Sequence, residues 1–216
     1  MSEFETLPGW FGVIDGPDFS GKTTQINMAK EYAAKENLDI IFTREPGGTE
    51  LGEELREIML HNRKYNLSPE VEFGLLLTAR LDTNDNLILP ALKAGKGVVV
   101  DRGPKSTDAY QGGGSGMSRK LIQQVHKLVF PKWYNQPDGS VILSISRETG
   151  HERMIARKAL SGLDKIEERD IEFYDRVYDV YKEHELSPHV TVIDGEQSPE
   201  DVFKQVKPVL FGPEHS

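Results

Sequence analysis

The sequence contains no cysteine among its 216 residues. This absence excludes a disulfide-stabilised scaffold, a cysteine-ligated zinc or iron–sulfur centre, and a catalytic thiol. Long apolar runs are also missing. No stretch approaches the ~18 residues that a membrane span needs, and the acidic first residues are not followed by an apolar segment. We therefore expect no membrane association, no secretory signal and a cytoplasmic location.

Positive charge is scarce as well. Lys and Arg number 26 against 35 Asp and Glu, which gives a formal net charge of −9. This balance disfavours non-specific nucleic-acid binding, so we expect no nucleic-acid partner. If the ligand is a phosphate, a few well-placed basic residues must supply the positive field.

Short β-rich runs alternate along the chain with longer amphipathic runs. Strands are predicted at 10–15, 39–43, 97–101, 141–146 and 190–194. Helices are predicted at 21–36, 51–60, 69–92 with a bend at Pro90, 118–130, 148–159, 168–186 and 199–210, and a glycine-rich loop at 112–116. This alternation predicts an α/β fold, with a five-stranded parallel sheet and helices on both faces. Without linkers or repeats, residues 1–216 are expected to form a single domain.

Residues 16–23, GPDFSGKT, match the phosphate-binding pattern G-x-x-x-x-G-K-[ST] in full. The pattern follows a predicted buried strand and opens a predicted helix, so successive backbone N–H groups can point at an anion. Lys22 can reach the outer phosphates of a nucleoside triphosphate, and Thr23 can offer its hydroxyl to Mg²⁺. The predicted nucleotide-binding residues are Gly16, Ser20, Gly21, Lys22, Thr23 and Thr24.

A carboxylate ends the third predicted strand. Asp101 follows three valines, so it lies at the sheet edge where ligands of parallel sheets bind. We interpret it as a metal-site residue together with Thr23, although a simple turn or N-cap role is the alternative.

Two arginines occupy the same sheet edge. Arg44 comes directly after the second predicted strand, and Arg102 follows Asp101. Two guanidinium groups beside a phosphate-binding loop suit a second phosphate, because each can bind it with two hydrogen bonds. The alternative for each arginine is a surface ion pair.

Several stretches resemble the thymidylate kinase family. They are the phosphate-binding loop, TREPGGT at 43–49, LLLTAR at 75–80, the Asp101-Arg102 pair followed by STDAYQG at 106–112, and LDKIE at 163–167. They occur in the family's order from about residue 11 to residue 210. The resemblance implies a P-loop NTPase-type fold with a mobile lid at about 153–168, and ATP- and Mg²⁺-dependent conversion of dTMP to dTDP. It also implies a homodimer built on helices of the 51–92 region.

The resemblance further implies where the acceptor binds. Asp18 would contact its 3′-hydroxyl near Mg²⁺, and Arg44 and Arg102 would hold its phosphate. Arg80 would meet the pyrimidine edge. The other predicted substrate-binding residues are Leu76, Ser106, Thr107, Tyr110 and Gln111.

Within that set, Ser106 and Thr107 would lie beside the base. Tyr110 would pack on the sugar and disfavour a 2′-hydroxyl, and Gln111 would close that wall.

Four positions depart from the family pattern. Leu76 replaces an aromatic residue, Gly103 an aromatic residue or histidine, Ser144 an aspartate and Lys165 an arginine. These departures leave two alternatives open: a kinase for a 5-substituted dUMP, and a nucleotide-binding regulatory protein with weakened catalysis.

Phe19 stands in the phosphate-binding loop where some members of the family carry an arginine. This chain then resembles the members whose lid supplies the charge. Arg153 and Arg157 are four residues apart and share a helix face, and Gly162 can act as a hinge. The alternative is a solvated charged helix. The predicted catalytic residues are Asp18, Lys22, Arg102, Arg153 and Arg157.

Overall fold

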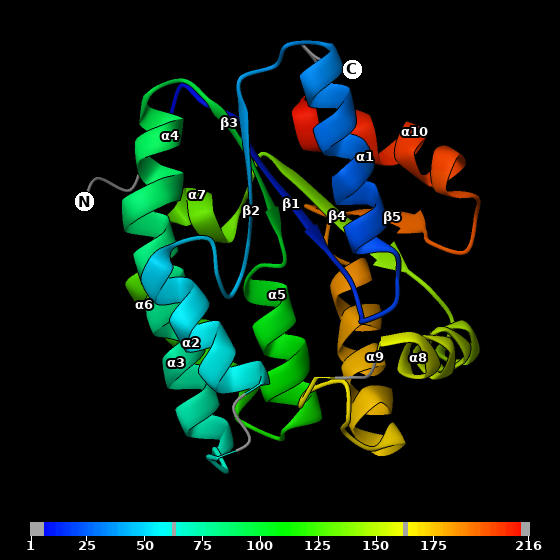
Figure 1. Ribbon diagram of the computed structural model, residues 1–216. Coiled ribbons are helices and arrows are strands. Elements are labelled where there is room, and N and C mark those ends of the chain that lie inside the picture. Colours follow the sequence, from blue (N-terminus) through cyan, green and yellow to red (C-terminus); the bar gives the residue numbers. More distant parts are fainter. Residues whose placement is uncertain (1–6, 62–63, 162–163, 213–216) are drawn as a thin grey trace.

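The computed structural model describes residues 7–61, 64–161 and 164–212 (Figure 1). Its five strands form one parallel sheet in the order β2-β3-β1-β4-β5. They are β1 (Phe11–Asp15), β2 (Ile40–Arg44), β3 (Gly97–Asp101), β4 (Gly139–Ser144) and β5 (Thr191–Asp194). In the central register, Val13 lies beside Val100 on β3 and Ser140 on β4. The predicted α/β fold class is confirmed.

Helices connect the strands and cover both faces of the sheet. They are α1 (Lys22–Lys35), α2 (Glu50–Leu60), α3 (Pro69–Thr83), η1 (Asn84–Ile88), α4 (Leu89–Lys93), α5 (Pro104–Thr107), η2 (Asp108–Gly114), α6 (Arg119–Val129), α7 (Lys132–Asn135), α8 (Arg147–Ser161), α9 (Ile171–Glu185) and α10 (Pro199–Phe211). The segments η1 and η2 are π-helical.

Strand side chains alternate between two cores, as the pleat requires. Ile14 and Val99 belong to a cluster that packs against α1 and α10, which lie together on one side of the sheet in Figure 1. Val13 and Val100 belong to a cluster on the other side, with side chains of α4 and α7. The layered core leaves the carboxyl ends of the strands free to carry functional side chains.

Short polar side chains begin several of the longer helices. Thr49, Ser68, Ser118 and Asp170 each accept a hydrogen bond from a backbone N–H in the first turn that follows. Asp170 thus starts α9 at Ile171, three residues later than the predicted position 168. Helix α1 differs, because its N-cap, Gly21, has no side chain to offer.

The predicted glycine-rich loop at 112–116 is wrong for most of its length. Residues 112–114 continue the helical segment α5–η2, which packs closely against α9. A Cβ on Gly113 would meet Val180, and one on Gly114 would overlap the ring of Phe173. The glycines therefore allow a close helix–helix approach and do not end the helix.

The long helix predicted over 69–92 is interrupted before Pro90. The π-helical turn η1 separates α3 from α4, which has Pro90 in its first turn. A proline lacks the N–H of a regular helix, so the preceding turn is where the hydrogen-bond pattern changes. Across the described ranges, no helix has the length and apolar character needed to cross a bilayer.

Candidate active site

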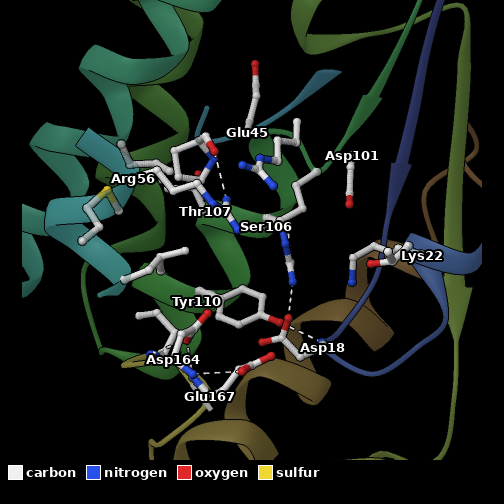
Figure 2. A pocket seen from close by; sticks show the side chains of 18 of the residues that line it. Asp18, Lys22, Glu45, Arg56, Asp101, Ser106, Thr107, Tyr110, Asp164 and Glu167 are labelled. Carbon is white, nitrogen blue, oxygen red and sulfur yellow. Dashed lines mark hydrogen bonds and ion pairs between the residues drawn. The ribbon is translucent and has the colours of Figure 1, made fainter. Parts of the chain in front are cut away.

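One cavity of about 750 Å³ opens at the carboxyl edge of the sheet (Figure 2). Most residues predicted from the sequence line it: Asp18, Gly21, Lys22, Thr23, Arg44, Leu76, Arg80, Asp101, Arg102, Ser106, Thr107, Tyr110, Gln111, Arg153 and Arg157. Ser20 and Thr24 line a neighbouring cavity of about 300 Å³, which shares Gly21 and Arg153 with the first. Of the predicted residues, only Gly16 lines neither cavity.

The phosphate-binding loop is held in its shape by left-handed backbone conformations. Gly16 has φ 141° and Gly21 has φ 98°, values that side chains rarely permit. Because Gly21 has no side chain to cap α1, no side-chain acceptor covers the first-turn N–H groups. A helix N-terminus in this state favours an anion.

Lys22 folds back over the loop that carries it. Its Nζ donates hydrogen bonds to the carbonyl oxygens of Gly16, at 3.0 Å, and Pro17, at 2.7 Å. Burial and the guanidinium of Arg102 lower the pKa of Lys22 to about 8, although Asp18 opposes the shift. The ammonium group thus lies against the loop, where phosphate oxygens can replace the two carbonyl oxygens as its hydrogen-bond acceptors.

Asp18 forms an ion pair with Arg102 at the centre of the cavity. Burial alone would raise the pKa of Asp18, but Arg102 and Lys22 lower it below its usual value. The Asp18 backbone N–H donates to the hydroxyl of Tyr110 at 2.9 Å, and the Arg102 guanidinium lies 5.0 Å from the centre of the Tyr110 ring. These contacts join the phosphate-binding loop to η2.

Ser106 links the side chain of Arg102 to Asp15. Its hydroxyl accepts a hydrogen bond from Arg102 Nη1 at 3.1 Å and donates to Asp15 Oδ1 at 2.6 Å. The hydroxyl of Tyr181 also donates to Asp15, at 2.7 Å. Sequence reasoning placed Ser106 beside a base and missed Asp15 and Tyr181, whose side chains come from distant parts of the chain.

Arg80 is buried and fixed on several sides. Its Nε lies 2.8 Å from Glu45 Oε2, and both side chains are only 1% exposed. Its two terminal nitrogens bond to Thr107 Oγ1 and to the carbonyl oxygen of Gly103. The Tyr134 hydroxyl donates to the other oxygen of Glu45. Arg80 is therefore held in one position among the residues that line the cavity.

The wall near Arg80 is apolar. Leu76 packs with Met59 and Leu60 of α2, and Ile166 lies against this cluster. All four side chains line the cavity. An aliphatic surface of this kind suits the face of a planar ring, without aromatic stacking.

A second group of cations lines the same cavity as the phosphate-binding loop. Arg44 pairs with Glu53 at 2.8 Å, and Arg56 donates to the carbonyl oxygen of Pro46 at 2.9 Å. Burial, together with Arg44 and Arg102, lowers the pKa of Arg56. Sequence reasoning missed Arg56. The sequence did offer one signal for it. Arg56 lies one turn after Glu53 on the helix that follows Arg44, and this spacing puts it near Arg44.

Arg153 reaches the phosphate-binding loop from α8. Its Nη1 lies 3.0 Å from the carbonyl oxygen of Phe19, and its Nη2 lies 3.1 Å from that of Gly195. Gly162, the predicted hinge, lies outside the described residues. Lys165 donates to the carbonyl oxygen of Tyr65 at 3.1 Å and is not among the cavity-lining residues.

Asp101 has the properties of a metal-site residue. Its Oδ1 is buried and has no hydrogen-bond partner among the described residues, and Figure 2 shows its side chain facing the same part of the cavity as Lys22. Thr23 lines that cavity too. No cluster of three or more His, Asp or Glu residues suited to a metal is present in the part of the chain that is described. Asp101 and Thr23 fit Mg²⁺ if phosphate oxygens complete its ligands.

Two further carboxylates line the cavity close to Asp18. Asp164 and Glu167 lie near Asp18 and Tyr110 in Figure 2. Asp164 Oδ1 accepts the backbone N–H groups of Ile166 and Glu167, each at 2.8 Å, and burial raises the pKa of Glu167. The LDKIE stretch was recognised in the sequence, but these two side chains were not singled out.

A phosphate-binding loop and a second cationic group, sharing one cavity above a parallel sheet, place the chain among P-loop phosphotransferases that act on nucleotides. The family model described as thymidylate kinase matches residues 14–206. The chain belongs to the thymidylate kinase family.

Individual relatives agree with this assignment. The chain is 36% identical over 210 residues to a thymidylate kinase of Legionella pneumophila (strain Paris), and the match covers 95% of each chain. It is 37% identical over 195 residues to one from Kosmotoga olearia, covering 89% of this chain and 91% of the relative. The crystal structure of thymidylate kinase from Ehrlichia chaffeensis superposes with a TM-score of 0.74 at 30% identity, covering 94% and 98% of the two chains.

Proposed function

We propose that the chain transfers the γ-phosphoryl group of ATP to the 5′-phosphate of dTMP, giving ADP and dTDP. The observation that carries this proposal is one continuous cavity lined by two groups of cations. Lys22 belongs to the phosphate-binding loop, and Arg44, Arg56 and Arg102, which come from other parts of the chain, line the same cavity. Two phosphorylated ligands can therefore meet end to end, as transfer between them requires.

The donor occupies the phosphate-binding loop. The uncapped N-terminus of α1 and Lys22 bind its β- and γ-phosphates, and the adjoining smaller cavity, lined by Thr24 and Arg153, receives the rest of the nucleotide. Asp101 and Thr23 would hold Mg²⁺, which neutralises charge on the phosphates when bound.

The acceptor lies between Arg102 and the apolar wall. Arg102, Arg44 and Arg56 bind its phosphate, and Asp18 receives the 3′-hydroxyl. The ring of Tyr110 packs against the sugar. The pyrimidine then lies on Leu76, with its edge at Arg80.

Transfer needs no strong base. The acceptor phosphate is already largely dianionic at neutral pH, so one of its oxygens can attack the γ-phosphorus in line and release ADP. Lys22, Arg102 and Arg153 share the negative charge of the transferring group, and closure of the 153–168 segment as a lid excludes water. Lys22→Ala is expected to abolish transfer.

We also propose a homodimer built on α2 and α3. Leu51 and Val71 on these helices are 44% and 48% exposed, so a partner that packed here would cover apolar side chains. Size-exclusion chromatography with light scattering tests this, and a monomer would refute it. A cytoplasmic location stays a prediction.

The activity is tested by ADP release with dTMP, dUMP, 5-hydroxymethyl-dUMP, dGMP and dCMP as acceptors. We expect the highest kcat/KM with dTMP, and no release by Lys22→Ala. A higher kcat/KM with 5-hydroxymethyl-dUMP would identify a kinase for modified pyrimidines. Binding of both nucleotides without ADP release would identify a regulatory protein.

A further inference from the structure

A second cavity lies on the reverse side of the helical segment that lines the candidate active site. It has a volume of about 960 Å³, within the range of nucleotide-sized sites. Pro104, Lys105 and Asp108 face it from α5–η2, whereas Ser106, Thr107, Tyr110 and Gln111 of the same segment face the first cavity. One short helical segment therefore separates the two cavities.

The lining of this second cavity is basic, although the chain as a whole is acidic. Three lysines line it, Lys105, Lys127 and Lys132, against a single carboxylate, Asp108. That carboxylate is already paired, because Asp108 Oδ2 lies 2.9 Å from Arg119 Nη2 and 3.1 Å from His184 Nε2. The net field in the cavity is thus positive, which favours an anion.

Lys105 lacks the partner that a largely buried ammonium group normally has. Its Nζ donates to the hydroxyl of Ser140 at 3.2 Å, and no carboxylate of the described residues lies within ion-pair distance. Burial lowers the pKa of Lys105, and only the more distant Asp15 opposes this shift. Lys127 and Lys132 have exposed side chains and no carboxylate partner among the same residues. Lys127 and Lys132 therefore keep their donors for a ligand, and Lys105 keeps those that it does not give to Ser140.

The rest of the lining suits an organic group attached to that anion. Ile122 and Phe130 supply buried apolar surface, and the amide side chains of Gln123, Asn135 and Gln136 lie around it. His126 also lines the cavity, and its buried Nε2 has no hydrogen-bond partner among the described residues. Apolar surface beside a few polar groups is the usual character of a small-molecule site.

We propose that this second cavity is a binding site for a small phosphorylated molecule, separate from the phosphoryl-transfer site. Lys105, Lys127 and Lys132 bind the phosphate, and the surface around Ile122 and Phe130 receives the organic part. The phosphate can belong to a nucleotide or be inorganic. Binding does not depend on the proposed function. Because α5–η2 lines both cavities, a ligand bound here also changes how the acceptor binds. This second effect rests on the proposed function.

The test is calorimetric titration of the full chain with the first cavity filled by dTMP, Mg²⁺ and the β,γ-imido analogue of ATP. The two probes are dTTP and inorganic pyrophosphate. We expect saturable binding of at least one probe, weakened by added salt. Tighter binding of dTTP would identify a nucleotide site, and equal or tighter binding of pyrophosphate would identify a site for inorganic phosphates.

Variants locate the binding. Lys105→Met and the double variant Lys127→Ala/Lys132→Ala should each weaken it by about tenfold or more, because each removes charge-assisted hydrogen bonds to phosphate. Lys30→Ala, an exposed lysine of α1 outside the cavity, is the matched control and should bind as wild type. The double variant alters only exposed side chains, so it remains informative if Lys105→Met does not fold.

No saturable binding of either probe would overturn the proposal, and so would binding that the double variant leaves unchanged. In ADP-release assays, a bound probe should change the KM for dTMP more than kcat. Binding without any change in KM would support the site and refute its effect through α5–η2. Absence of dTMP kinase activity would refute the proposed function without affecting the binding result.

Discussion

Arg153→Ala separates the chemical role of an arginine from its role in folding. Arg153 donates to the carbonyl oxygens of Phe19 and Gly195, at 3.0 and 3.1 Å, in a partly exposed setting. Two such bonds contribute about 1–2 kcal/mol to stability, against a total of about 5–15 kcal/mol. We expect the melting temperature to fall by about 2–8 °C and the chain to remain folded.

Turnover should fall much further. An arginine that stabilises a transferring phosphoryl group contributes about 10³-fold or more to kcat, which corresponds to about 4 kcal/mol. The assay is ADP release at saturating ATP and dTMP, beside thermal denaturation of the same sample. Arg153→Lys keeps the charge but cannot reach both carbonyl oxygens, so its kcat should lie between those of wild type and Arg153→Ala.

The matched control is Arg147→Ala on the same helix. Arg147 pairs with Asp175 and Asp179 of α9, outside the cavity, so its loss should leave kcat unchanged. If Arg153→Ala also keeps kcat within about threefold of wild type, Arg153 has no part in the chemistry. Its contacts with the loop would then be structural.

Three further predictions follow from the same structure. Asp101→Asn should raise the Mg²⁺ concentration needed for half-maximal rate by about tenfold or more, and an unchanged titration would remove Asp101 from the metal site. Between pH 8 and its ordinary pKa of 10.5, Lys22 is deprotonated in the folded chain and protonated in the unfolded chain. The free energy of unfolding of the ligand-free chain should therefore rise with pH in this range, and the affinity for ATP should fall. Both trends should vanish in Lys22→Met. Gly150→Ala should lower the free energy of unfolding, measured in urea, by about 1–3 kcal/mol, because the added Cβ would overlap the Tyr178 hydroxyl. Gly74→Ala, with open space around the added Cβ, should raise it by up to about 1 kcal/mol. Equal changes in the two variants would contradict the packing of α8 on α9.

Local signals in the sequence indicated many of the residues that line the candidate site. Lys22 was predictable because its motif determines the loop and the helix start together. Asp101 was predictable because parallel strands place their carboxyl ends at one edge. In both cases the chemistry depends on neighbours along the chain, and the structure brings these residues into one cavity.

The supporting residues depend on contacts across the fold. Tyr181 lies 166 residues from Asp15, and Tyr134 lies 89 residues from Glu45, yet each pair is joined by a buried hydrogen bond. No periodicity or motif specifies such contacts. The glycines of 112–114 misled for a related reason, because their small size serves packing against α9 and not a turn.

The contacts of Lys22 have a consequence for how tightly a nucleotide can bind. Without ligand, its ammonium group already satisfies two carbonyl oxygens of its own loop, at 3.0 and 2.7 Å. An incoming triphosphate must displace this internal competitor, so the measured affinity is lower than the phosphate contacts alone would give. The same internal partners hold the ammonium in place when the product departs, which favours release of ADP over its retention.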